Sequence, residues 1–310
     1  MKFLFSLLFL GSISLSSAQQ NKLFVSQDLI ISEWIEGTLL LPIDKKEDEI
    51  LAIIISDFGP TDRNGNQSFM KSNCLKQLAE SLSAQKIASF RYDKRIVKQI
   101  RTRKPSKQTT FDDLVTDAID VINYFKSRKR FKKIVVVGHG QGSLVGMIAA
   151  KNKADAFVSI AGTAYNIGDV IIREIKKTAP VHLEKVKYII GKLKSGRRVG
   201  NYPKELTYVL NSKIQPYMIS WMKHDPQKII QDLNIPVLIV NGTKDLQVNN
   251  DEGLLLKKAN KNAELIEVKN MNHVLFEIDG NDLENSKSYN ESFRKISKTL
   301  INGVKEFITS

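Results

Sequence analysis

The chain has 310 residues, 42% of them hydrophobic and 26% charged, which is enough to fold around a core of its own. Its formal net charge of +14 favours anionic surfaces as partners. The basic residues are not interleaved with aromatic ones and no nucleic-acid motif is present, so we expect no nucleic-acid partner. The single cysteine, Cys74, excludes an internal disulfide, so the core must hold the fold together.

The chain begins with a pattern typical of a signal peptide. Lys2 precedes an apolar run, and Ser16 and Ala18 flank a cleavage point before Gln19. We expect residues 1–18 to be removed and residues 19–310 to form the mature protein, with a retained anchor as the alternative. No later stretch is apolar for long enough to span a bilayer. The expected product is exported, periplasmic or secreted, and not transmembrane after processing.

Buried strands then alternate with helical patterns along the chain. Strands are expected in residues 29–42, 50–59, 87–95, 133–138, 155–162, 235–245 and 263–270, and helices in residues 70–83, 110–130, 143–151, 251–258 and 289–308. Such alternation predicts right-handed crossovers and a mostly parallel sheet with helices on both faces. The two strands expected within residues 29–42 belong antiparallel at its edge.

This rhythm is interrupted between about residues 165 and 226, where the pattern indicates helices and loops. The interruption follows the carboxyl end of a strand, and ligands of open parallel sheets bind outside those ends. We therefore expect an α/β fold with an inserted helical cap over a binding site.

The sequence Gly138-His139-Gly140-Gln141-Gly142 has the G-x-S-x-G spacing of a nucleophile elbow, between a predicted strand and a predicted helix. Flanking glycines let the strand and the helix pass close together, and the apex backbone is strained. The alternative is a phosphate cradle at the helix N-terminus. No Lys-Ser or Lys-Thr follows and the spacing fits no dinucleotide fingerprint, so the elbow is favoured.

Two later residues support the elbow. Asp245 follows a buried strand, and His273 lies in the loop after the last predicted strand. The order apex, Asp, His is that of hydrolase triads of this kind. In such a triad His takes a proton from the nucleophile and Asp orients the imidazole.

The chain resembles the α/β-hydrolase family, in particular exported bacterial esterases and serine aminopeptidase-like hydrolases. The matching segments cover nearly all of the mature chain in order, among them "EGTLLLP", "FGPTDRNGN", "FRYDKR", the elbow, "SIAGTAYN", "ISWMKHDP", "IPVLIVNGTKDLQV" and the "NH" at residues 272–273. The resemblance implies that Asp245 is the acid and His273 the base. It also implies two oxyanion donors, the backbone N–H of Gln141 and one near Phe58.

Three departures from the family pattern matter. The apex serine is replaced by Gly140, which has no attacking oxygen. "FRYDKR" runs into the basic stretch Lys94–Lys107, for which we expect a solvated loop, with an anion-binding patch as the alternative. Asp57 and Phe58 stand where small residues are usual in the oxyanion loop.

Other residues are poor replacements for the serine. Ser143 lies one turn into the helix and is expected to cap or pack, and Cys74 is expected to be a small buried hydrophobe. His182 and His224 lie in the insertion. No metal-spaced pair of histidines occurs, so we expect neither a metal nor a cofactor.

Three interpretations stay open. In the first, the protein binds a small ester or acyl ligand, or a protein partner, without catalysis. In the second, Asp245 and His273 activate a water in the space left by the serine side chain, which gives slow hydrolysis. In the third, Gly140 is an isolated variant of an ordinary serine hydrolase. An anionic envelope surface is a further candidate partner, because of the net charge.

Overall fold

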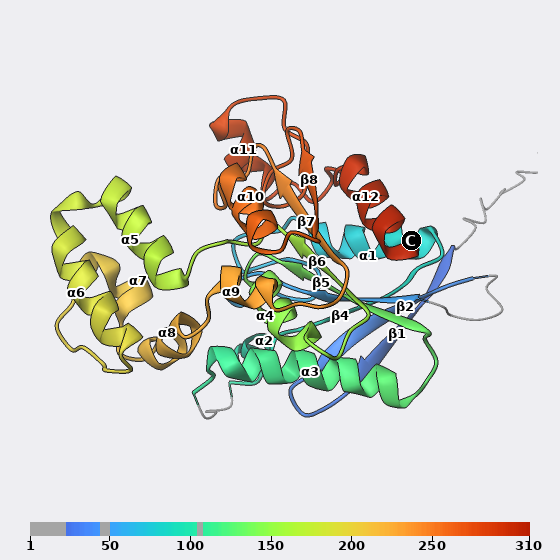
Figure 1. Ribbon diagram of the computed structural model, residues 1–310, viewed down its shortest axis with the longest axis horizontal. Helices are drawn as coiled ribbons and strands as arrows, with labels where there is room; N and C mark the ends of the chain where they lie inside the picture. Colours follow the sequence, from blue (N-terminus) through green and yellow to red (C-terminus); the bar gives the residue numbers. More distant parts are fainter. Residues whose placement is uncertain (1–22, 44–49, 104–107) are drawn as a thin grey trace, which may run out of the picture.

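The computed structural model describes residues 23–43, 50–103 and 108–310, and the predicted signal peptide falls outside them. Within these residues one eight-stranded sheet has the order β1-β2-β4-β3-β5-β6-β7-β8 (Figure 1). Its strands are β1 (Phe24–Ile30), β2 (Glu36–Pro42), β3 (Ile50–Ile55), β4 (Ala88–Tyr92), β5 (Lys133–His139), β6 (Ala156–Ile160), β7 (Val237–Gly242) and β8 (Glu264–Val268). The β1–β2 and β2–β4 pairs are antiparallel and all other pairs are parallel, as predicted.

Helices cover both faces of the sheet and confirm the expected α/β fold class. The helices of the described residues are α1 (Cys74–Ala84), α2 (Arg95–Thr102), α3 (Phe111–Ser127), α4 (Gln141–Ala150), α5 (Ile167–Thr178), α6 (Leu183–Lys194), α7 (Thr207–Leu210), α8 (Gln215–Met222), α9 (Pro226–Gln231), α10 (Asn250–Ala259), α11 (Asp282–Ser288) and α12 (Lys298–Thr309), with short 3₁₀ turns at Pro180–His182 and Lys204–Leu206. None of the described helices is both long and apolar enough to cross a bilayer.

The core lies in two layers, one on each side of the sheet. In β3, Ile53 and Ile55 belong to the layer under α3 and α4, whereas Ala52 and Ile54 belong to the layer under α1 and α12. Side chains of a strand point alternately to opposite faces, so a strand covered on both sides must be apolar at every position. This explains the unbroken apolar runs of the central strands.

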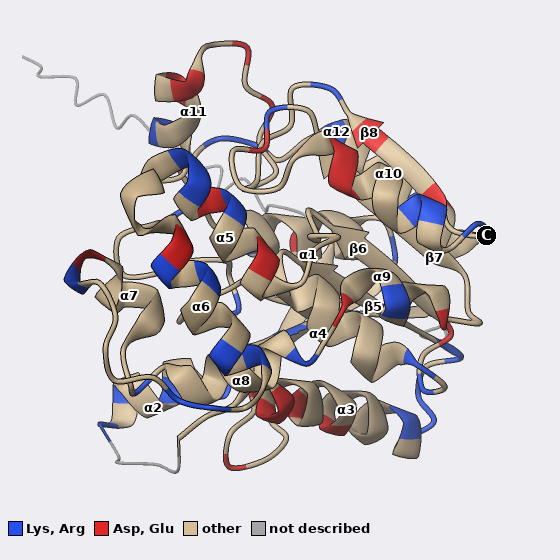
Figure 2. Ribbon diagram, turned by 60° about the vertical axis from the view of Figure 1, so that its left-hand side comes forward, with Lys and Arg blue, Asp and Glu red and all other residues tan. Residues whose placement is uncertain are grey.

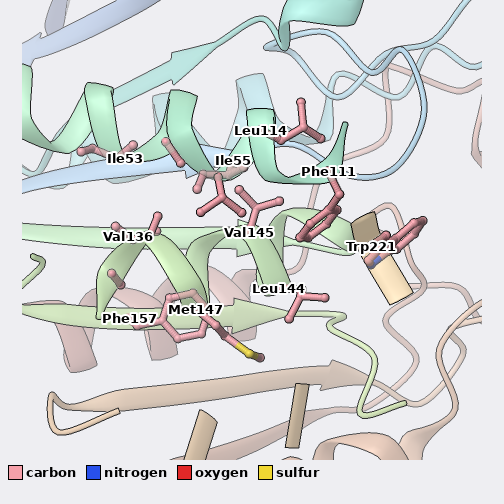
Figure 3. Close-up of a cluster of buried hydrophobic side chains, with 14 of the residues drawn as sticks. Ile53, Ile55, Phe111, Leu114, Val136, Leu144, Val145, Met147, Phe157 and Trp221 are labelled. Atoms are coloured by element: carbon pink, nitrogen blue, oxygen red, sulfur yellow. The ribbon is translucent and has the colours of Figure 1, made fainter. Parts of the chain in front are cut away.

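Helices α5 to α8 stand apart from the sheet, at the left of Figure 1, in the stretch where the sequence rhythm is interrupted. They join the rest of the molecule chiefly through α8. The Trp221 ring of α8 stacks on the Phe111 ring of α3, with centroids 5.7 Å apart and planes 3° apart (Figure 3). Both rings are buried, so this contact anchors the inserted helices beside the carboxyl ends of the strands.

The basic stretch that starts at Lys94 is not the solvated loop expected from the sequence. Its first part forms α2, and Lys98 and Arg101 both pair with Glu36 at 2.6 Å. Arg95 pairs with the buried Asp117 at 2.5 Å. The expectation was wrong because these carboxylates lie on other elements, far away in the sequence.

The last helix also begins later than predicted. It was expected from residue 289, but α12 begins at Lys298. Ser297 caps it, because its hydroxyl accepts a hydrogen bond from the Leu300 N–H at 3.3 Å. Just before it, Ile296 forms an isolated β-bridge with Phe276, and the residues from Tyr289 to Arg294 form turns, such as the one closed by the Arg294 N–H and the Glu291 carbonyl oxygen at 2.9 Å.

Candidate functional site

The glycine-rich turn has the backbone of a nucleophile elbow. It connects β5 directly to α4, and Gly140 at its apex has φ +55° and ψ −120°. A Cβ on Gly142 would lie 2.3 Å from the Ile55 carbonyl oxygen, so the helix can approach β3 only because this residue is glycine. The turn therefore raises residue 140 to the carboxyl edge of the sheet, as the spacing of the motif predicts.

The place of the serine side chain is not empty, which corrects the expectation of a vacant apex. Asp57, two residues beyond the end of β3, points its carboxylate at the apex. A Cβ on Gly140 would lie 1.9 Å from Asp57 Oδ1. The same oxygen accepts a hydrogen bond from the Gln141 backbone N–H at 2.7 Å. Asp57 thus fills the position of the nucleophile and binds the predicted oxyanion donor.

Asp245 and His273 come together as a hydrogen-bonded pair. His273 Nδ1 lies 2.8 Å from Asp245 Oδ2, and the other oxygen of Asp245 accepts the backbone N–H groups of Gln247 at 2.7 Å and Val248 at 3.0 Å. The second ring nitrogen of His273, Nε2, lies 3.1 Å from Asp57 Oδ2. The imidazole is therefore held between two carboxylates, one from each side.

These contacts decide the charge of the imidazole. Burial by itself lowers the pKa of His273, but the charges and hydrogen bonds of Asp245 and Asp57 outweigh burial and raise that pKa to about 10. Burial raises the pKa of Asp57, but the hydrogen bond and charge of His273 outweigh it and hold that pKa well below its usual range. At neutral pH the site is an imidazolium between two carboxylates. A protonated imidazole cannot accept a proton as a general base.

Lys94 and His139 complete the surroundings of the three charged groups. The buried Lys94 ammonium donates a hydrogen bond to the Asp57 carbonyl oxygen, and burial lowers the pKa of Lys94 to about 8. His139 Nε2 lies 2.7 Å from the His273 carbonyl oxygen. Burial lowers the pKa of His139 and favours its neutral form, whose Nε2–H donates to that oxygen. The backbones of Asp57 and His273 are each held by a neighbouring side chain.

Phe58 contributes to the wall of a cavity. Its ring stacks on Trp221 of α8, with centroids 5.5 Å apart. Its carbonyl oxygen accepts hydrogen bonds from the Thr61 hydroxyl at 2.6 Å and from Gln67 Nε2 at 2.9 Å, which fixes the loop after β3. The oxyanion role of the backbone near Phe58 stays a prediction.

The cavity beside Phe58 has a volume of about 440 Å³. Apolar side chains from α2, α3 and α8 form much of its wall, with the neutral amides Gln67, Gln99 and Gln108 among the polar ones. Tyr217 of α8 connects this cavity to the elbow, because its hydroxyl donates to Gln141 Oε1 at 2.9 Å. The lining is Phe58, Gly59, Pro60, Gln67, Ile96, Gln99, Gln108, Thr109, Leu114, Asn211, Lys213, Ile214 and Tyr217.

The remaining sequence candidates lie elsewhere. The buried Ser143 hydroxyl is 2.6 Å from the Ser159 hydroxyl, and Cys74 is buried in α1, where burial raises its thiol pKa to about 11. His224 Nε2 lies 2.8 Å from Asp112 Oδ1, and His182 lies 3.6 Å from a carboxylate oxygen of Glu205. Among the described residues no group of three or more His, Cys, Asp or Glu could hold a metal ion.

Sequence reasoning missed the role of Asp57. The signal was an acid in place of a small residue in the oxyanion loop, but its direction toward the apex could not be read from the sequence. Asp57 is 84 positions away from Gln141 in the sequence and 216 positions away from His273, the two residues that its carboxylate contacts.

The strand order, the elbow and the Asp–His pair behind it define an α/β hydrolase. Residues 69–229 match the family described as serine aminopeptidase, S33, and the chain belongs to that family. The esterase EstD of Thermotoga maritima is 27% identical over 233 residues, which are 74% of this chain and 55% of that protein. The chain thus spans about half the length of this curated relative.

Solved structures of two esterases are similar in fold. Est1E from Butyrivibrio proteoclasticus has a TM-score of 0.53 at 17% identity and is covered over 97% of its length by 86% of this chain. The Pyrococcus furiosus esterase Pf2001 has a TM-score of 0.55 at 15% identity, with 92% of this chain and 91% of that one covered. At identities this low the similarity shows the fold only, and the reaction must be inferred from the residues of the site.

Proposed function

We propose that this chain is an esterase-like hydrolase that binds a small ester or acyl ligand beside the elbow and hydrolyses it, at best slowly, by direct attack of water. The observation that carries the proposal is the retained pair of His273 and Asp245, whose side chains are buried and lie 2.8 Å apart. An acyl-enzyme route is absent because residue 140 has no side-chain oxygen. Family membership and the esterase EstD as a relative support an ester as the substrate.

Water attack requires a change in the resting site. The Gln141 N–H must be released from Asp57 before it can stabilise an oxyanion, and His273 must lose its proton before it can act as a base. Both requirements point to the same event, a movement of the Asp57 carboxylate away from the apex. Turnover is slow because the resting ion pairs oppose that movement.

Ligand binding without turnover is the second candidate function. It is favoured by Asp57, whose carboxylate occupies the oxyanion donor that ester hydrolysis needs. The cavity of about 440 Å³ is large enough for a small acyl group in either case.

The test compares wild type with His273→Ala in the hydrolysis of nitrophenyl acetate and nitrophenyl butyrate, with binding followed by thermal stabilisation. Slow turnover that disappears in His273→Ala supports the water mechanism. Ligand-induced stabilisation with no turnover in wild type supports the binding candidate. A protein that neither hydrolyses these esters nor is stabilised by them contradicts both.

We also propose that the protein acts outside the cytoplasm, on the basis of the pattern in residues 1–18. Expressed in a bacterium with its own first residues, the protein is expected in the periplasmic fraction or the medium, beginning at Gln19. N-terminal sequencing checks this, and a full-length cytoplasmic product contradicts it.

A further inference from the structure

We propose that Asp57 is itself a nucleophile, a carboxylate that acts from the oxyanion loop in place of the missing serine. Its substrate class is an alkyl electrophile in which a saturated carbon carries a strained ether oxygen, that is, an epoxide. The proposal goes beyond ester hydrolysis and does not depend on it, because the two reactions make different demands on Asp57. In ester hydrolysis Asp57 is an obstacle, whereas here it is the reacting group.

The two oxygens of the Asp57 carboxylate have different partners. Oδ1 accepts the Gln141 N–H at 2.7 Å, and Oδ2 lies 3.1 Å from His273 Nε2. The Asp57 side chain is 14% exposed, whereas His273 and Asp245 are 3% and 1% exposed. Of the three charged groups, the carboxylate of Asp57 is therefore the one most open to a ligand.

The chemistry of a carboxylate selects the electrophile. Attack on an ester carbonyl would produce an anhydride, which is more reactive than the ester consumed. Attack on a saturated carbon produces an ordinary alkyl ester, a covalent intermediate of the kind that carboxylate nucleophiles form. The charged state of the site also fits, since the imidazolium beside Oδ2 can give its proton to a leaving oxygen.

In the first step, an electron pair of Asp57 Oδ2 forms a bond to a ring carbon of the epoxide. The bond from that carbon to the ring oxygen breaks, and its electron pair stays on the oxygen. That oxygen takes the proton of His273 Nε2 and becomes a hydroxyl. Asp57 is now an alkyl ester, His273 is neutral, and the carbonyl oxygen of the ester is Oδ1, still on the Gln141 N–H.

In the second step, water attacks Asp57 Cγ while His273 Nε2 takes one of its protons. The negative charge develops on Oδ1, where the Gln141 N–H already points. The bond from Cγ to Oδ2 breaks, the departing alkoxide takes the proton from His273, and the product leaves as a diol. The new carboxylic acid returns its proton to His273, which restores the resting site.

The alternating charge of Asp57 makes His273 an acid in one step and a base in the next. Two carboxylates hold the imidazole protonated in the resting site, and burial opposes them. Esterification removes the charge of Asp57. Burial then still lowers the pKa of His273, and only the charge of Asp245 still raises it. His273 is protonated when a leaving oxygen needs a proton and becomes a base when water must lose one.

An apolar substituent of the epoxide can enter the cavity whose wall begins one residue after Asp57. Phe58, the next residue, forms the cavity wall together with Ile96, Leu114, Ile214 and Tyr217. Styrene oxide, whose phenyl group is small and uncharged, is therefore the probe.

The experiment follows styrene oxide with the mature protein in water labelled with heavy oxygen, and analyses the Asp57 peptide by mass spectrometry. Acid-quenched samples are expected to contain an alkyl ester at Asp57, and turned-over protein to contain heavy oxygen in its carboxylate. Asp57→Asn is expected to lose both signals and to slow consumption by roughly 1000-fold. Asp232→Asn, on an exposed carboxylate in a surface ion pair, is the matched control and keeps them.

Diol that carries the label from the first turnover, with none in Asp57, overturns the proposal in favour of direct water attack. So does an Asp57→Asn variant that is folded by circular dichroism and as fast as wild type, or a wild type that leaves styrene oxide unchanged. Nitrophenyl butyrate is assayed in parallel. Activity on one substrate without the other shows which proposal has failed.

Discussion

At the scale of single residues, the site is governed by the exchange of a serine for a carboxylate from another loop. Gly140 removes one side chain, and Asp57 supplies another at the same place. The two residues are coupled by space, because a Cβ at residue 140 and the carboxylate of Asp57 cannot occupy it together. Changes at either position must therefore be interpreted as a pair.

The coupling predicts that Gly140→Ser alone does not restore serine catalysis. The new Cβ would lie 1.9 Å from Asp57 Oδ1, and φ is +55° at this position, so the variant is expected to lose about 1–3 kcal/mol of stability to strain and crowding. The double variant Gly140→Ser/Asp57→Gly is expected to show a burst with nitrophenyl butyrate, since it has both a hydroxyl and a free Gln141 N–H. Asp57→Gly alone is the control without a nucleophile, and a burst in the Gly140→Ser single variant contradicts the prediction.

The shifted pKa values predict how stability depends on pH. The pKa of His273 rises from 6.5 to about 10 on folding, so its contribution is complete below pH 6.5 and is lost as pH rises toward 10. Asp57 has a lowered pKa, so its contribution is complete above its unfolded value of 3.8 and is lost in acid. Urea unfolding of wild type and Asp57→Asn is expected to show a stability difference that is largest between these limits and shrinks toward pH 10. A difference that grows above pH 7 contradicts the assignment.

At the scale of elements, α2 and α8 hold the loops around the site. The ion pair from Arg95 of α2 to Asp117 of α3 is largely buried, with side chains 14% and 4% exposed. The pair fixes the first residue of α2 and therefore the position of the preceding residue, Lys94, whose ammonium donates a hydrogen bond to the Asp57 carbonyl oxygen. The aromatic rings of α8 contact both Phe111 and Phe58.

Arg95→Met is expected to cost about 3 kcal/mol, because it leaves the buried Asp117 carboxylate without its partner. Equilibrium urea unfolding measures this loss. Lys151→Met, which breaks the exposed pair with Asp232, is the matched control and is expected to cost less than about 1 kcal/mol. Equal losses in the two variants would show that the α2 pair is no more important than a surface pair.

Trp221→Ala is expected to cost about 3–5 kcal/mol, because it deletes a buried ring that stacks on two others. Tyr188→Ala on α6, 62% exposed, is the control and is expected to change stability by less than about 0.5 kcal/mol. A Trp221→Ala variant with the same free energy of unfolding as wild type would show that α8 is not anchored by this contact.

At the scale of the whole molecule, a net charge of +14 is spread rather than gathered. Lys and Arg outnumber Asp and Glu on α5 and α6 and also lie on other elements (Figure 2), and pairs such as Lys194 with Asp169 at 2.6 Å neutralise part of the charge. The cations of α2 are paired as well. We therefore expect attraction to an anionic envelope to come from the summed field of the molecule.

Binding to phosphatidylserine vesicles is expected to be weak at about 0.01 M salt and to vanish near 0.15 M, because the Debye length falls from about 30 Å to about 8 Å. Co-sedimentation measures it, with neutral phosphatidylcholine vesicles as the control. Binding that survives high salt would instead indicate a specific lipid site.

The sequence by itself determined the order of elements, the elbow and the positions of Asp245 and His273 behind their strands. Each of these depends on local chemistry: apolar periodicity, the need for glycine in a tight turn, and chain order. Only the tertiary structure decided that Asp57 fills the apex, that α2 is an ion-paired helix, and that α12 begins after the β-bridge of Ile296 with Phe276. These features depend on partners from distant elements, and the direction of a side chain in a loop is set by what it meets in space.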